Sequence, residues 1–135
     1  KPHEFRRWVP PASIVGQWVA IHAGARAMRR SEIQDLILRL GDPEKAWSVG
    51  LKPEAGPILE RMLSNPALVP LSSVVCIATL GKPVQAKSLI DPGIGDSDRV
   101  DHQKWAWPME HVKRLDPPRP CRGAQGFWRW DPGEV

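Results

Sequence analysis

Three side chains of complementary chemistry lie within the first six residues of the chain. Lys1, Glu4 and Arg6 follow the spacing K-x-x-E-x-R and bring together an amine, a carboxylate and a guanidinium. A lysine that is desolvated in a cleft has a lowered pKa and can act as a base, whereas an arginine keeps its charge and suits a phosphate or a base edge. The alternative is an ordinary ion pair on a solvated strand edge. Both interpretations stay open.

A strand is the element that would position these side chains. We expect a strand over residues 3–8, in which Glu4, Arg6 and Trp8 project from one face because side chains alternate along a strand. Lys1 has the opposite parity. We place it in the turn entering the strand, from which its flexible stem can swing toward Glu4.

The composition bounds the class of protein. A length of 135 residues, with 41% hydrophobic and 25% charged residues, is typical of a single globular domain. No window approaches the ~18 consecutive apolar residues of a membrane span. The net charge of +4 permits an anionic partner such as RNA without requiring one. Seven Trp and no Tyr offer stacking surfaces if exposed and core packing if buried.

Cysteine and histidine usage predicts neither a disulfide framework nor a metal site. Cys76 lies in a valine-rich run and Cys121 between a proline and an arginine, so we expect unpaired thiols in a reducing, cytoplasmic compartment. The four histidines are scattered without zinc spacing, and we expect no cofactor. His22 lies in an apolar strand pattern and is interpreted as a hydrogen-bonded core histidine.

Periodicity predicts strands at both ends of the chain with helices between them. Apolar positions at i, i+3, i+4 and i+7 predict a helix over 31–40, with a capping box from Ser31 to Gln34, and a second helix runs from Pro57 to before Pro66. The expected strands are 17–23, a buried central strand at 73–80, a strand at 104–115 with Pro108 at an edge or bulge, and a closing strand at 125–130. A long loop is expected at 86–103. The fold class is α+β with a curled or barrel-like sheet.

The order of these motifs resembles a known family. K-x-x-E-x-R followed by Trp8-Val9-Pro10, and then the segment 16–23, resembles the ASCH domain (the ASC-1 homology domain). Residues 73–80, 105–107 and 122–128 are similar to later landmarks of the family. The resemblance covers nearly the whole chain, and implies one ASCH-like domain over 1–135 with a PUA-like fold, a curled mixed, mainly antiparallel β-barrel with flanking helices. The family's motif glycine and N-terminal strand would lie before Lys1.

This resemblance implies RNA or a nucleotide-like ligand as the partner. The residues themselves predict neither a membrane partner nor a metal. The implied site is a K-x-x-E-x-R cleft with six binding residues: Lys1, Glu4, Arg6, Trp8, Trp105 and Arg122.

Two alternatives remain. One is a hydrolase, a ribonuclease or an amidohydrolase of modified nucleosides, with Lys1 as catalytic residue beside Glu4 and Thr79. Related amidohydrolases carry a threonine where Glu4 stands here, which argues against the same nucleophile. The other is a partner-binding module of a coregulator-type assembly. The sequence does not indicate the oligomeric state.

Overall fold

The structure, a computed structural model, describes residues 2–89 and 105–132, apart from the side chains of Trp47 and Ser48. Lys1 and residues 90–103 of the expected loop lie outside the described residues. The first part of that loop is a short 3-10 helix, η3 (Ala86–Leu89).

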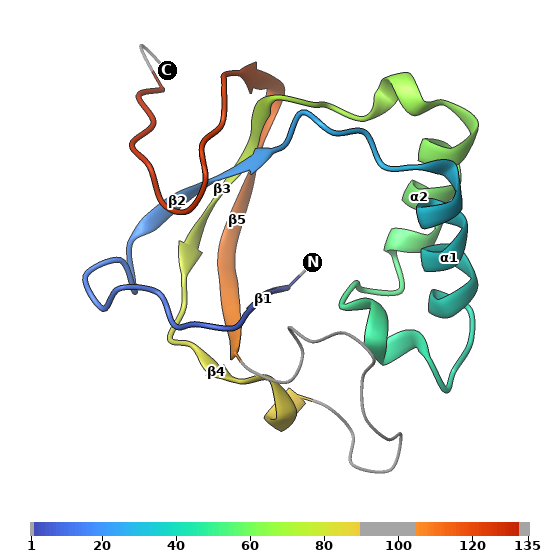
Figure 1. The fold of residues 1–135 in the computed structure, drawn as a ribbon, viewed down its shortest axis with the longest axis horizontal. Helices are drawn as coiled ribbons and strands as arrows, with labels where there is room; N and C mark the ends of the chain where they lie inside the picture. The colour runs from blue at the N-terminus through green and yellow to red at the C-terminus, as the bar shows by residue number, and fades with distance from the viewer. Residues whose placement is uncertain (1, 90–104, 133–135) are drawn as a thin grey trace.

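A five-stranded antiparallel sheet forms one half of the molecule in the described part of the chain (Figure 1). Its strands are β1 (His3–Arg6), β2 (Trp18–Ala23), β3 (Ser73–Leu80), β4 (Val84–Gln85) and β5 (Trp105–Pro120). Their order is β1-β5-β3-β2, and β4 also pairs with β5. The α+β class and the curled antiparallel sheet, which forms a half-barrel, are therefore confirmed.

The curl of the sheet has a local cause in β5, which extends beyond the strand predicted for 104–115. Its pairing with β3 shifts register twice, between Val74 and Cys76 and between Ile77 and Thr79. Each shift inserts extra residues on β5, and such bulges bend a strand and increase its twist. His111 adopts a positive φ of 50° at the second shift. The 16 residues of β5 thereby curve enough to pair with three other strands.

Pro108 lies between two strands and is not at an edge. It pairs with His3 of β1, and its carbonyl oxygen accepts the Gly81 N–H at 2.8 Å. A proline has no N–H to contribute to the ladder, but its carbonyl remains an acceptor. The core of the sheet lies around this part of the structure, where Leu80, Ala106 and Trp107 are buried.

Two helices, α1 (Arg30–Leu40) and α2 (Ala55–Ser64), pack mainly on each other and stand to one side of the sheet (Figure 1). Ile33 and Leu59 are their buried residues. Short 3-10 helices, η1 (Ala46–Val49) and η2 (Pro66–Leu68), flank α2 in the chain. Two linkers, residues 24–29 and 65–72, connect this pair to the sheet. No helix in the described ranges is long and apolar enough to cross a bilayer.

The start of α1 differs from the prediction. The N-cap is Arg29, and the Glu32 carboxylate accepts the Arg29 N–H at 3.0 Å, so Ser31 lies inside the first turn. A carboxylate is a stronger acceptor than the Gln34 amide, and negative charge in the first turn is favoured by the helix dipole. The hydrogen bond from the Arg29 backbone, followed by that from the Arg26 side chain, lowers the pKa of Glu32.

The closing strand predicted at 125–130 is wrong. This segment forms no strand and instead loops back beside β2 (Figure 1). Phe127 and Trp128 pack against rings of the sheet, so the segment contributes side-chain contacts without adding to the ladder.

Candidate nucleic-acid interface

The pairing of β1 with β5 gathers four of the residues expected to bind RNA. Glu4 lies opposite Trp107, and Arg6 lies opposite Trp105. Residues directly opposite each other in an antiparallel pair project from the same face. Trp8 lies two residues beyond the end of β1 and its ring contacts that of Trp107, so Glu4, Arg6, Trp8 and Trp105 come together around the buried Trp107.

Arg6 joins the charged and the aromatic parts of this surface. Its guanidinium lies 3.0 Å from a Glu4 carboxylate oxygen and 5.5 Å from the centre of the Trp8 ring. The Arg6 side chain is 47% exposed and the Glu4 side chain 27%. A cation over an exposed indole contributes about 0.5–1 kcal/mol, and an exposed ion pair contributes about 0–1 kcal/mol. Arg6 is therefore held in place weakly, and its charge remains accessible to an anion.

Trp107 is the buried support of the surface. Its indole Nε1–H donates to the main-chain carbonyl oxygen of Trp8 at 2.9 Å. The Trp8 ring meets the Trp107 ring edge-on, with centroids 6.1 Å apart and planes at 77°. Trp107 is 4% exposed whereas Trp8 is 52% exposed. One indole is thus fixed in the core, and the other presents an open surface beside it.

Phe127 belongs to the same surface, a role that its position in the sequence does not predict. Its ring stacks on Trp107, with centroids 5.8 Å apart and planes 8° from parallel, and the residue is 46% exposed. The signal available in the sequence was the run of arginine, glycine and aromatic residues from 122 to 130. The strand predicted over 125–130 does not indicate which ring of the sheet Phe127 contacts.

The structure does not pair two other expected site residues, Arg122 and Thr79, with this group. Arg122 is exposed in the segment after β5, and within the described residues it makes no hydrogen bond or ion pair with Glu4 or Arg6. Thr79 pairs with Trp18 and with Glu110. Glu110 follows Trp107 by three positions along β5, so alternation puts Thr79 on the opposite face from Trp107. Lys1 lies outside the described residues.

His22 has the hydrogen bond expected from its strand, although its side chain is half-buried and not part of the core. Its Nε2–H donates to the Cys121 carbonyl oxygen at 2.8 Å, and its ring meets Trp128 edge-on at 5.6 Å.

Cys76 and Cys121 are both free cysteines, as expected. Burial raises the pKa of the Cys76 thiol, which favours its protonated form.

An exposed Trp elsewhere in the sheet resembles Trp8 in its local contacts. Trp18 of β2 is 51% exposed, and the Lys113 ammonium of β5 lies 5.0 Å from its ring centre. Trp18 is opposite Thr79, on the face that does not carry Trp107. The two tryptophans thus share exposure and a neighbouring cation but differ in their surroundings.

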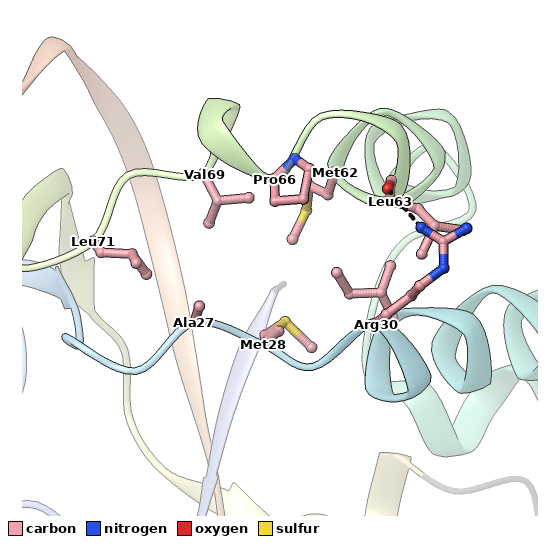
Figure 2. Close-up of a pocket in the computed structure, with 9 residues that line it drawn as sticks. Ala27, Met28, Arg30, Met62, Leu63, Pro66, Val69 and Leu71 are labelled. Atoms are coloured by element: carbon pink, nitrogen blue, oxygen red, sulfur yellow. Dashed lines mark hydrogen bonds between the residues drawn. The ribbon is translucent and has the colours of Figure 1, made fainter.

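A small apolar pocket lies away from this surface, between the two linkers and the helix pair (Figure 2). The Arg30 guanidinium crosses one end of it and donates to the Leu63 carbonyl oxygen at 3.3 Å. Its other lining residues are Ala27, Met28, Ile33, Met62, Pro66, Val69 and Leu71.

In the described ranges, no group of three or more His, Cys, Asp or Glu side chains is arranged to hold a metal ion.

Comparison of the chain with protein-family models and with curated proteins gives no match.

Proposed function

We propose that this protein is an ASCH-like domain with a PUA-like fold that binds single-stranded RNA, or a nucleotide-sized part of it, on the surface formed by Glu4, Arg6, Trp8 and Trp105. The observation that carries the proposal is the exposed Trp8 ring, seated on the buried Trp107 and flanked by the Arg6 guanidinium. Free thiols support a reducing compartment, and we propose the cytoplasm.

Each part of this surface suits a different part of a nucleotide. An exposed indole offers an apolar face on which a base can stack, and such stacking is worth about 1–3 kcal/mol per base. Arg6 offers a permanent positive charge and a fork of N–H donors for the phosphate that follows the base. Glu4 is a hydrogen-bond acceptor that suits the exocyclic amine of a base, as carboxylates do with cytosine N4.

Lys1 is proposed as a further phosphate contact from its place in the motif. As an enzyme, the protein would instead use Lys1 as a base, with Glu4 beside it, to hydrolyse RNA or a modified nucleoside. The hydroxyl of Thr79 lies on the opposite face from Trp107, which does not favour it as a partner of Glu4. The open aromatic surface and the charge of Arg6 favour binding over hydrolysis.

A direct titration tests the proposal. Intrinsic tryptophan fluorescence is followed while a six-nucleotide single-stranded RNA is added at low salt, and the same strand annealed to its complement serves as control. We expect the single strand to bind more tightly and to quench the fluorescence, because only unpaired bases can stack on Trp8. Equal affinity for the single strand and the duplex, or no binding at low salt, would contradict the proposal.

A further inference from the structure

The segment after β5, residues 121–132, is called the strap here, and it is tied down at both ends. At its start, the Cys121 N–H donates to the Ser72 carbonyl oxygen at 2.9 Å. At its end, the Arg119 guanidinium donates to the Pro132 carbonyl oxygen at 3.1 Å. The strap (red in Figure 1) returns along the sheet beside β2. It thus follows a defined course although it forms no strand.

His22 is the sheet residue that the strap contacts. The His22 ring donates from Nε2 to the Cys121 carbonyl oxygen and contacts the edge of Trp128. Gly123 lies so close to the ring that a Cβ there would be 2.6 Å from His22 Cε1 and 2.8 Å from Nδ1. Real Cβ atoms do not approach ring atoms so closely, so any larger residue at 123 must lift the strap or displace the imidazole.

The strap carries Phe127 to the buried indole that also supports Trp8. Because the centroids of Trp8 and Phe127 lie 6.1 and 5.8 Å from that of Trp107, the two exposed rings are at most about 12 Å apart. One face of Phe127 covers Trp107, and nearly half of the residue remains exposed. A few nucleotides of an extended single strand can span the two rings, with a base on each.

We infer that the strap presents Phe127 as a second stacking surface, for a base close to the one on Trp8, and that His22 and Gly123 are positioning residues that hold it there. The inference rests on the proposed function and restricts the class of ligand. The ligand is a single strand with at least two unpaired bases. The strap's contribution to affinity is carried by one aromatic ring.

The first experiment compares two RNA probes, six-nucleotide oligoadenylate and the same strand with one base retained and abasic sugars elsewhere. Phe127→Leu keeps an apolar contact with Trp107 but has no ring face, and we expect it to weaken binding of the full strand by about 5- to 150-fold. Binding of the single-base probe should stay unchanged, since Trp8 accepts its base. Phe127→Tyr keeps the ring and should restore the affinity of the full strand.

The second experiment tests the positioning residues without RNA. Trypsin cuts after Arg122 and Arg129, which are both exposed, and cleavage at these sites should be faster when the strap leaves the sheet. Gly123→Ala should speed both cleavages and should reduce affinity for the full strand to the Phe127→Leu level. Gly24→Ala is the matched control, because a Cβ at Gly24 meets nothing within 4 Å and neither glycine has a positive φ.

The outcomes separate the two claims. Failure of the wild-type protein to bind either probe overturns the proposed function, whereas the trypsin result still reports on the strap. Normal binding of both probes by Phe127→Leu overturns the second stacking surface and leaves the first intact. Wild-type cleavage rates in Gly123→Ala overturn the positioning role of His22 and Gly123.

Discussion

The indole N–H of Trp107 donates to the main-chain carbonyl oxygen of Trp8 across 2.9 Å. The backbone that carries the exposed ring is therefore fixed by a buried side chain, and the Trp8 side chain takes no part in that hydrogen bond. The consequence is a separation of roles, in which Trp107 stabilises the fold and Trp8 is available to a ligand. Substitutions at the two positions should have different effects.

Replacing Trp107 with Phe should destabilise the protein. The change removes the N–H donor from the Trp8 carbonyl and leaves unfilled volume at a residue that is 4% exposed. We expect a loss of about 1–3 kcal/mol in the free energy of unfolding, measured by urea denaturation. Trp18→Phe, at an exposed indole, should change the free energy of unfolding by no more than about 0.5 kcal/mol. Equal losses in the two variants would remove the supporting role of Trp107.

Binding of single-stranded RNA should weaken as salt increases, because arginine and lysine contacts release condensed counterions. Arg6→Gln should lower the slope of log K against log salt by about 0.7, the value for one phosphate contact on a single strand. The control is Arg39→Gln, since Arg39 is ion-paired with Asp35 on α1, away from the sheet. A slope that stays unchanged in Arg6→Gln would show that Arg6 contacts no phosphate.

Stability should depend on pH through His3. Burial lowers the pKa of His3 below its ordinary value of 6.5, because the charged imidazole is poorly solvated in the folded protein. As the pH falls through 6.5, the unfolded chain binds the proton first, so the free energy of unfolding should decrease. The contribution is fully present above pH 6.5 and is lost on acidification below it.

The measurement is urea denaturation at several pH values between about 5 and 8, compared with His3→Gln. As the pH falls below 6.5, the free energy of unfolding of the wild type should decrease relative to that of His3→Gln. A constant difference across this range would show that His3 does not titrate differently in the folded and unfolded states.

Variants of Lys1 distinguish a binding protein from a hydrolase. Lys1→Met removes the charge and keeps most of the stem, whereas Lys1→Arg keeps the charge but cannot give up its proton as a base. We expect Lys1→Met to weaken RNA binding by about 1–3 kcal/mol and Lys1→Arg to retain it, with no cleavage of RNA by either protein or by wild type. RNA hydrolysis by the wild type that is lost in Lys1→Arg would establish the enzyme instead.

The sequence predicts the elements whose signals are local. The apolar repeat from Ile33 to Leu40 predicts α1, and the β-branched run at 73–80 predicts β3 with the bounds that the structure gives. Alternation along β1 places Glu4 and Arg6 on one face, and the structure puts them opposite Trp107 and Trp105. These features depend on neighbours in the chain or on a single strand pairing.

The remaining features depend on contacts between distant residues. The stacking of Phe127 on Trp107 joins positions 20 residues apart. The bulges that curve β5 arise from its pairing with β3, and they allow a 16-residue strand where alternation indicated one ending at 115. The strand predicted at 125–130 is absent, because the rings of Phe127 and Trp128 pack onto Trp107 and His22 of the sheet from outside the ladder.

The most direct test of the binding surface compares Trp8→Ala with Trp18→Ala. The two residues are 52% and 51% exposed, and each has a cation within 5.5 Å of its ring centre, Arg6 over Trp8 and Lys113 over Trp18. The affinity of each protein for a six-nucleotide single-stranded RNA is measured at one fixed salt concentration. Trp8→Ala should weaken binding by about 5- to 150-fold and Trp18→Ala by less than about twofold. Equal losses in the two variants, or unchanged binding in Trp8→Ala, would contradict the account.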